Sequence, residues 1–371
     1  MYQGKKLHFI SMDVPFPPNY GGVIDVFYKL KAFHQLGIDI HLHLFGFNET
    51  DSDVLRIYAK EVYFYPIHQK PYYIFQKYPI SVKSRDSKLL YERIKSLKAP
   101  IFFESLKTTF ILNKYKLGGY SKYLRLHNIE QNYFSGLAVS EKNLVKKALF
   151  YIEAKKYIQY ENIIHQFDEV FTLSKFEQNY IQEKYNKGKF VPVFHGNETF
   201  QSLSEKGKFA LYHGDLRASD NCKVVDFLIE VFKGIDYPFV IASGSRENWV
   251  KAKIKNHPHI QFVKLKDFDH LKNLFEKAHL NIAWSFQESG TKLKVINALF
   301  NSRFSIINEN VIDDEKISGL CVQVSNKSEL IKAINYLKNH PFLASKEYID
   351  TLEYDLNDKL NAEIILKQIF N

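Results

Sequence analysis

The stretch Lys6-Leu-His-Phe-Ile-Ser-Met-Asp13, followed by Pro15-Phe-Pro-Pro-Asn-Tyr-Gly21-Gly22, decides how this sequence folds. Its apolar run is short and is broken by His8 and Asp13, so it predicts a β-strand and not a secretory signal. The two glycines then open a segment that is predicted to be helical as far as about Gln35. A strand that turns directly into a helix is the repeating unit of parallel α/β sheets.

The alternation of short β-rich runs and helical patterns continues to the end of the chain. Two helix starts carry capping boxes, Ser174-Lys-Phe-Glu177 and Asn326-Lys-Ser-Glu329, and Asn221 precedes a third apolar helical series. We therefore predict an α/β fold with doubly wound parallel sheets covered on both faces. The predicted strands are 6–13, 38–45, 61–65, 100–103, 122–127, 168–173, 189–194, 209–216, 239–244, 260–265, 280–285, 304–308 and 320–324.

The length of the chain predicts more than one domain, because 371 residues exceed the size at which a single core usually stops growing. A polar stretch at 195–208 precedes a fresh strand and marks the boundary. We predict an N-terminal Rossmann-like domain over 1–200, a second Rossmann-like domain over 201–345, and a helical tail over 346–371 that packs back on the first domain.

Composition favours a cytoplasmic protein. Cys222 and Cys321 are isolated, which fits a reducing compartment, and no apolar run reaches the ~18 residues needed to cross a bilayer. The formal charge of +10 is concentrated in the window 60–125, which holds fourteen Lys or Arg and four Asp or Glu among many aromatic residues. This window predicts contact with an anionic membrane surface or a phosphorylated substrate, with an ordinary solvated face as the alternative. No nucleic-acid-binding motif accompanies the charge, so no nucleic-acid partner is expected.

Two segments of the first domain carry candidate site residues. The amides of Gly21 and Gly22 open a helix and suit a phosphate, although a tight turn alone would also explain the glycines. In Tyr123-Leu-Arg-Leu-His127-Asn128-Ile-Glu130-Gln131, His127 is expected at the carboxyl end of a strand, where ligands of open α/β sheets bind. Asn128 is a predicted helix cap that pairs with Gln131. His127 and Glu130 are the candidate catalytic residues, and the acceptor is assigned to Arg125, Asn128 and Glu104.

Two segments of the second domain complete the site. His213-Gly214-Asp215-Leu216-Arg217 follows the first strand of this domain, and Arg217 offers charge to a phosphate. In Glu288-Ser289-Gly290-Thr291-Lys292-Leu-Lys294, two lysines stand at a helix start, which is unfavourable unless an anion is bound there. A nucleotide diphosphate would supply that anion. The predicted donor-binding residues of these segments are Gly214, Arg217, Glu288, Ser289, Gly290, Thr291, Lys292, Lys294 and Asn297.

These motifs, in this order, resemble glycosyltransferase family 4. The resemblance rests on Pro-x-Gly-Gly, Leu-His-Asn-Ile-Glu, Thr-Leu-Ser-Lys-Phe-Glu, His-Gly-Asn-Glu, His-Gly-Asp-Leu and Glu-Ser-Gly-Thr-Lys-Leu-Lys-Val-Ile-Asn-Ala-Leu. It implies a GT-B fold, with two Rossmann-like domains facing a central cleft. It also implies a retaining transfer in which Gly21, Gly22 and the Gly290 loop grip the donor diphosphate and His127 touches the donor sugar.

The sequence also departs from the family pattern. The usual acidic pair would fall at Ser289 and Asn297, the turn arginine is Asp215, and a basic position is Asn221. On this reading Lys292 and Lys294 replace the basic ligands, and Glu288 stands one residue from the first acid.

The predicted function is transfer of a hexose from a nucleotide-diphosphate sugar to a glycan or lipid-linked acceptor in surface polysaccharide or glycoconjugate synthesis. The alternatives are a catalytically silent GT-B protein that binds a glycan or nucleotide, and a sugar-nucleotide epimerase. No cofactor and no metal are expected. No Asp-x-Asp motif occurs, and His41-x-His43, interpreted as an exposed strand edge, lacks a third ligand.

Overall fold

The computed structural model describes residues 2–18, 21–46, 52–141, 143–203, 205–286 and 293–371. The chain forms two compact units, one built from 1–196 and 358–371 and the other from 197–357. The predicted tail therefore divides. Residues 346–357 belong to the second unit, and only 358–371 belong to the first.

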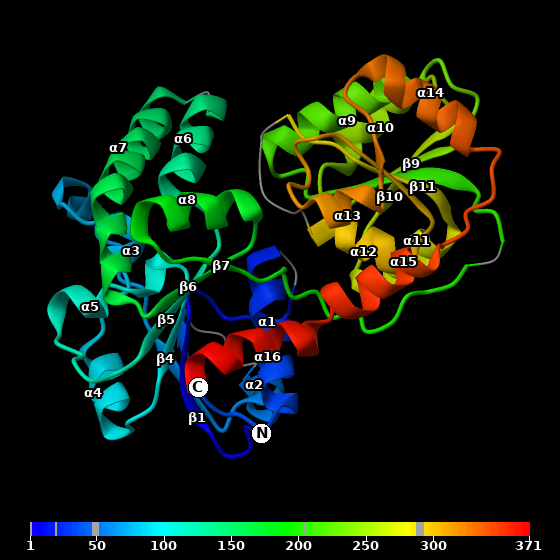
Figure 1. The fold of residues 1–371 in the computed structure, drawn as a ribbon. Coiled ribbons are helices and arrows are strands. Elements are labelled where there is room, and N and C mark those ends of the chain that lie inside the picture. Colours follow the sequence, from blue (N-terminus) through cyan, green and yellow to red (C-terminus); the bar gives the residue numbers. More distant parts are fainter. Residues whose placement is uncertain (1, 19–20, 47–51, 142, 204, 287–292) are drawn as a thin grey trace. The chain divides into compact units, whose positions relative to one another are not determined.

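The first unit is built on a parallel seven-stranded sheet of order β3-β2-β1-β4-β5-β6-β7 (Figure 1). Apolar residues alternate along its strands. Phe9 of β1 joins the core under α1, α2 and α16, whereas Ile10 joins the core under α4, α5, α7 and α8. The strands are β1 Lys6–Ser11, β2 Asp39–Phe45, β3 Glu61–Tyr65, β4 Ile101–Glu104, β5 Lys122–Leu126, β6 Glu169–Thr172 and β7 Lys189–Phe190. The helices are α1 Gly21–Gln35, α2 Ser52–Tyr58, α3 Ile80–Lys83, α4 Lys88–Ser96, α5 Ile111–Lys114, α6 Glu130–Ser140, α7 Leu144–Tyr160, α8 Lys175–Tyr185 and α16 Asp358–Phe370.

The second unit repeats this plan on a parallel six-stranded sheet of order β10-β9-β8-β11-β12-β13. Helices α9, α10 and α14 cover one face, and α11 and α12 cover the other. The strands are β8 Phe209–His213, β9 Phe239–Ser243, β10 Ile260–Lys264, β11 Ala278–Ala283, β12 Phe304–Ile307 and β13 Val322–Gln323. The helices are α9 Ser219–Phe232, α10 Glu247–Ile254, α11 Phe268–Lys277, α12 Leu293–Asn301, α13 Glu315–Gly319, α14 Lys327–Leu337 and α15 Lys346–Asp350.

The α/β prediction is confirmed, because every predicted strand overlaps an observed one and all the strand pairs within both sheets are parallel. The caps at Ser174 and Asn326 are also confirmed, since their side chains accept from the backbone amides of Glu177 and Glu329. Within the described residues, no helix combines the length and apolar character needed to span a bilayer.

Three local predictions are wrong. Helix α6 begins at Glu130 with Ile129 at its cap position, so Asn128 does not cap it. Helix α9 begins at Ser219, two residues before Asn221. The side-chain amide of Asn221 instead donates to the backbone carbonyl of Asp215 at 2.8 Å. His43 does not lie on an exposed edge, because β2 pairs with both β1 and β3 and the His43 side chain is fully buried.

Candidate functional site

A cluster of five ionisable residues is buried in the first unit, near the carboxyl ends of β4 and β5. Glu104 ends β4, Arg125 lies opposite it in β5, and His127 follows β5 by one residue. Asp25 and Lys29 stand one turn apart on α1. We call these five residues the buried charge cluster. In an open parallel sheet this edge is where ligands bind.

Two cations and two anions balance inside the cluster. The Lys29 ammonium donates to Asp25 Oδ2 at 2.7 Å and to Glu104 Oε1 at 2.6 Å, and all three side chains are at most 1% exposed. Burial by itself raises the pKa of Asp25, but the charges of Lys29, Arg125 and His127 outweigh it and hold that pKa well below its usual range. The carboxylate of Asp25 is therefore ionised at neutral pH.

His127 is the member of the cluster that is nearest to solvent. Its Nε2 lies 2.6 Å from Glu104 Oε2, and its side chain is 6% exposed. The contact with Glu104 engages Nε2 and leaves Nδ1 as the ring nitrogen that can meet a ligand. Lys29, Glu104 and His127 thus form a chain of charge-assisted hydrogen bonds that fixes the orientation of the imidazole. An oriented imidazole of this kind suits contact with a sugar hydroxyl.

The same residues include a geometric candidate for a cation. One ligand atom each from Asp25, Glu104 and His127 lies within 4.8 Å of the others. The Lys29 ammonium, however, already contacts both carboxylates. A metal ion would have to displace that charge or sit against it, so the donor set does not fit a cation well.

Arg125 and Glu104, which were predicted to bind the acceptor, have buried structural partners instead. The Arg125 guanidinium is fully buried and donates to the carbonyls of Thr172, Val191 and Pro192 as well as to Asp25. Glu104 is fully buried between Lys29 and His127. These side chains position the site from within and offer an acceptor no exposed atom.

Glu130 lies beside this cluster at the start of α6. Its Oε1 accepts from Ser105 Oγ at 3.2 Å and pairs with Lys107 Nζ at 3.3 Å, while its buried Oε2 has no hydrogen-bond partner among the described residues. Ser105 follows β4 with a φ of 70°, a conformation that a non-glycine residue rarely adopts. Such strain concentrates at functional sites. Sequence reasoning missed Ser105 and Lys107, which no motif marks.

The predicted phosphate site at Gly21 lies at the start of a helix. Helix α1 begins at Gly21, with no acidic residue in its first turn. Within the part of the chain that the structure describes, a side chain built at Gly21 would meet nothing within 4 Å, so packing against those residues does not require this glycine. Open space over the positive end of a 15-residue helix suits an anion. The pattern Asp25-x-x-x-Lys29 just beyond it was the sequence signal for the buried pair, and it was missed.

The turn after β8 is tighter than the one at Gly21. A side chain at Gly214 would stand 3.1 Å from the Tyr212 hydroxyl and 3.4 Å from Asn221, so packing alone accounts for this glycine. The Arg217 side chain is 79% exposed and pairs with Asp215 at 2.8 Å. The predicted phosphate contact of Arg217 would compete with that pair.

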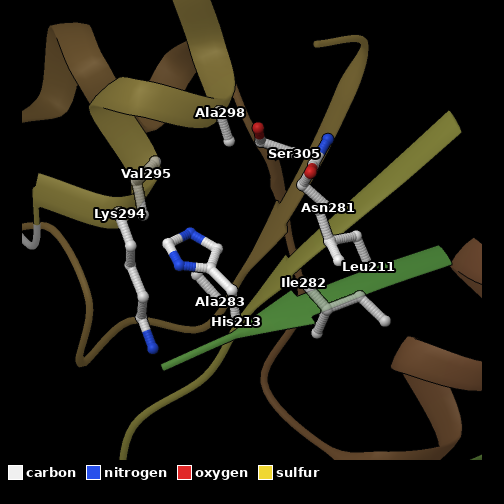
Figure 2. A pocket seen from close by; sticks show the side chains of 9 residues that line it. All are labelled: Leu211, His213, Asn281, Ile282, Ala283, Lys294, Val295, Ala298 and Ser305. Atoms are coloured by element: carbon white, nitrogen blue, oxygen red, sulfur yellow. The ribbon is translucent and has the colours of Figure 1, made fainter. Parts of the chain in front are cut away.

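Lys294 lies in the first turn of α12, as predicted, beside the half-buried His213. Figure 2 shows its side chain running alongside the His213 ring in a small pocket at the carboxyl end of β8. The ammonium lies 5.1 Å from the centre of the Tyr212 ring. Burial, and then the charge of Lys294, lower the pKa of His213 to about 3, so this imidazole is neutral.

Asn297 is buried in a network of asparagine side chains. Its Oδ1 accepts from Asn197 Nδ2 at 2.9 Å, and Asn197 Oδ1 accepts from Asn301 Nδ2 at 2.7 Å. At the position where the resembled family has its second acid, this chain thus has an asparagine whose side chain is held within the second unit. The predicted donor ligands Glu288, Ser289, Gly290, Thr291 and Lys292 lie outside the described residues.

Comparison with known sequences finds one relative of note. No protein-family model matches the chain. A 44.6 kDa protein in the cps region of Klebsiella pneumoniae is 24% identical over 326 residues, which cover 81% of this chain and 82% of that protein.

Comparison with solved structures finds neighbours that span both units. Sucrose-phosphate synthase from Thermosynechococcus elongatus is 14% identical, with a TM-score of 0.62 over 98% of this chain and 95% of that one. A trehalose-6-phosphate structure from E. coli bound with UDP-2-fluoro glucose is 8% identical, with a TM-score of 0.66 over 98% and 99%. Anabaena HepE in complex with UDP-glucose is 12% identical, with a TM-score of 0.57 over 99% and 95%. At such low identities the likeness establishes the fold.

Proposed function

Because the chain has the GT-B fold of these glycosyltransferases, we propose that it is itself a glycosyltransferase that takes a sugar from a nucleotide-diphosphate donor. The observation that carries the proposal is the hydrogen-bonded chain Lys29–Glu104–His127 at the carboxyl end of β5. It holds an imidazole in one orientation at the edge of the sheet where ligands bind. Neighbours with this fold were solved with UDP-glucose, with UDP-2-fluoro glucose and with ADP, which supports a nucleotide-sugar donor.

The proposed mechanism needs no covalent protein nucleophile. Negative charge grows on the diphosphate as the glycosidic bond breaks, and preorganised amides and lysines that hold it more tightly at that moment lower the barrier. In the first unit the start of α1 at Gly21 is suited to that task, and in the second unit, considered separately, the ammonium of Lys294 is. Retention at the anomeric carbon and a hexose as the sugar are the finer parts of the proposal and rest on the resemblance.

The acceptor is proposed to be a glycan or a lipid-linked sugar in surface polysaccharide synthesis. The support is the Klebsiella pneumoniae relative, a protein in the cps region. We do not assign the acceptor to Arg125 or Glu104, because both are fully buried. Asn128, between His127 and α6, is the remaining predicted acceptor ligand.

A thermal-shift screen against UDP, GDP, ADP and CMP and their sugars tests the proposal. The melting temperature is expected to rise with one nucleotide class and to rise further with its sugar, since a ligand bound to the folded state stabilises it. Release of the nucleoside diphosphate from the stabilising donor then separates a transferase from a silent binding protein. Stabilisation without release of the nucleoside diphosphate would favour the catalytically silent binding protein. If no nucleotide raised the melting temperature, the proposal of a nucleotide-sugar donor would be refuted.

A further inference from the structure

Helix α7 presents an apolar face that no other part of the described chain covers. Leu144, Val145, Tyr151, Ile152 and Ile158 are 80%, 70%, 41%, 38% and 54% exposed. The spacing 144, 148, 151, 155 and 158 follows one side of a helix, with Val145 and Ile152 beside it. We call these five apolar residues, with Lys147 and Lys155, the α7 face.

The opposite side of α7 packs into the core of the first unit. Glu153, Ala154, Tyr157 and Tyr160 are buried there, and Tyr157 and Tyr160 belong to the core under the sheet. Figure 1 shows α7 at the outside of this unit, paired with α6. The α7 face is therefore apolar surface additional to what folding uses. Contiguous exposed apolar surface marks an interaction site more often than single exposed residues do.

The exposed charge of α7 has one sign. The helix carries Lys146, Lys147, Lys155 and Lys156, and its only acidic residue is Glu153. The Glu153 carboxylate is buried, accepts from the backbone amide of Ile80 at 2.8 Å and lies 3.3 Å from Lys156. The α7 face thus combines aliphatic and aromatic side chains with lysines and has no acid of its own.

We propose that the α7 face binds the surface of an anionic lipid bilayer, with its apolar side chains in the interfacial region and its lysines among the headgroups. A helix with apolar and basic side chains on one face suits this environment. A second copy of the chain fits less well, because pairing two such faces would bring lysines together with no acid between them. The proposal does not depend on sugar transfer, although it would bring the first unit to a lipid-linked acceptor.

The segment Pro71–Phe75 extends this surface. Lys156 of α7 donates to the carbonyl of Tyr73 at 3.1 Å, and Tyr72 and Phe75 of the same segment are 51% and 89% exposed. Within the predicted basic window 60–125, this segment is the part that lies beside the α7 face. Elsewhere in the window, Arg125 is buried, Lys83 and Lys114 pair with Asp86, and Lys60 pairs with Asp39. The basic window predicted from sequence is therefore not one open face.

Vesicle sedimentation with the full chain tests the proposal. The protein is expected to be retained on phosphatidylcholine vesicles that contain phosphatidylglycerol, more weakly at high salt, and little on phosphatidylcholine alone. Loss of each lysine should lower partitioning roughly fivefold, so Lys147→Glu with Lys155→Glu should abolish the preference for anionic lipid. Leu144→Ser with Ile152→Ser should weaken retention at both salt concentrations.

Matched controls lie in the second unit. Leu343 is 85% exposed and Lys332 is an exposed residue of α14, so Leu343→Ser and Lys332→Glu should leave retention unchanged. Equal retention on neutral and anionic vesicles, or equal retention of the α7 variants and the wild type, would overturn the proposal. A mass increase with concentration that Leu144→Ser abolishes would assign the face to a second copy instead. Release of nucleoside diphosphate from a soluble donor is unaffected by these outcomes, so failure here leaves the proposed activity standing.

Discussion

At the scale of single residues, Lys29 is the most consequential side chain in the first unit. Its ammonium is the nearest positive charge to both Asp25 and Glu104, and it is fully buried. Removing one partner of a buried ion pair leaves an uncompensated charge in a medium that solvates it poorly. This energetic cost is much smaller for an ion pair at the surface, because water solvates the charge that has lost its partner.

Lys29→Met is therefore expected to lower the free energy of unfolding of the first unit by about 3–5 kcal/mol, measured by urea denaturation. Lys60→Met is the control, because Lys60 pairs with Asp39 at 2.6 Å but is 56% exposed. That substitution should cost less than about 1 kcal/mol. Equal losses in the two variants would contradict a balanced buried cluster.

His213 makes the stability of the second unit depend on pH. The fold lowers the pKa of His213 to about 3, whereas in the unfolded chain the imidazole titrates near its ordinary value of 6.5. Below pH ~6.5 the imidazole is protonated in the unfolded state but stays neutral in the folded state. The contribution of His213 to the free energy of unfolding is therefore fully present above pH ~6.5 and is lost as the pH falls towards ~3. One such site costs about 2 kcal/mol between pH ~7 and pH ~5.

Both tryptophans, Trp249 and Trp284, lie in the second unit, so tryptophan fluorescence follows its unfolding alone. His213→Leu should reduce the fall in unfolding free energy between these two pH values by about 2 kcal/mol. His340→Gln, at an exposed ring, should leave the pH dependence as it is. A His213→Leu variant that keeps the full pH dependence would show that the His213 imidazole is not its source.

At the scale of elements, α16 completes the first unit from the far end of the sequence. Ala362, Ile365, Leu366 and Ile369 are buried in the core beside α1. The carboxylate of Asp358, which begins the helix, accepts from the amides of His195 and Gly196. The second unit makes none of these contacts, so its stability should not depend on α16.

Leu366→Asp is expected to destabilise the first unit by at least about 3 kcal/mol, because it places a carboxylate in a closed apolar core. The far-UV circular dichroism transition should split, while the tryptophan transition of the second unit stays in place. Ile364→Asp is the control on the same helix, where Ile364 is 37% exposed. A shift of the tryptophan transition by Leu366→Asp would show that the units do not unfold separately.

Elements were also the scale at which sequence reasoning was most accurate. Strand runs and capping boxes such as Ser174-x-x-Glu177 are local, and local patterns predicted them. The cap at Asn128 failed because the helix begins two residues later, and His43 was misplaced because alternation along a strand does not say which strands flank it. The buried charge cluster joins residues that are far apart in the sequence, such as Arg125 and Asp25, and only the folded chain brings them together.

At the scale of the whole molecule, each unit, taken by itself, holds a described group suited to a phosphate or a sugar. The first unit offers the start of α1 and the oriented His127, and the second offers Lys294 beside His213. The sequence has Ser289 and Asn297 at the positions where the family that it resembles has an acidic pair, and the side chain of Asn297 is held by Asn197. Transfer is therefore proposed to depend on preorganised positive groups and one oriented imidazole.

The most direct test of that account is the rate at which nucleoside diphosphate is released from the donor that stabilises the chain best. The wild type is expected to release it, and His127→Ala, verified to be folded at the assay temperature, to do so roughly ten- to a hundredfold more slowly, as loss of one hydrogen bond to the sugar predicts. Stabilisation by the donor with no release, or release at the wild-type rate by His127→Ala, would contradict it.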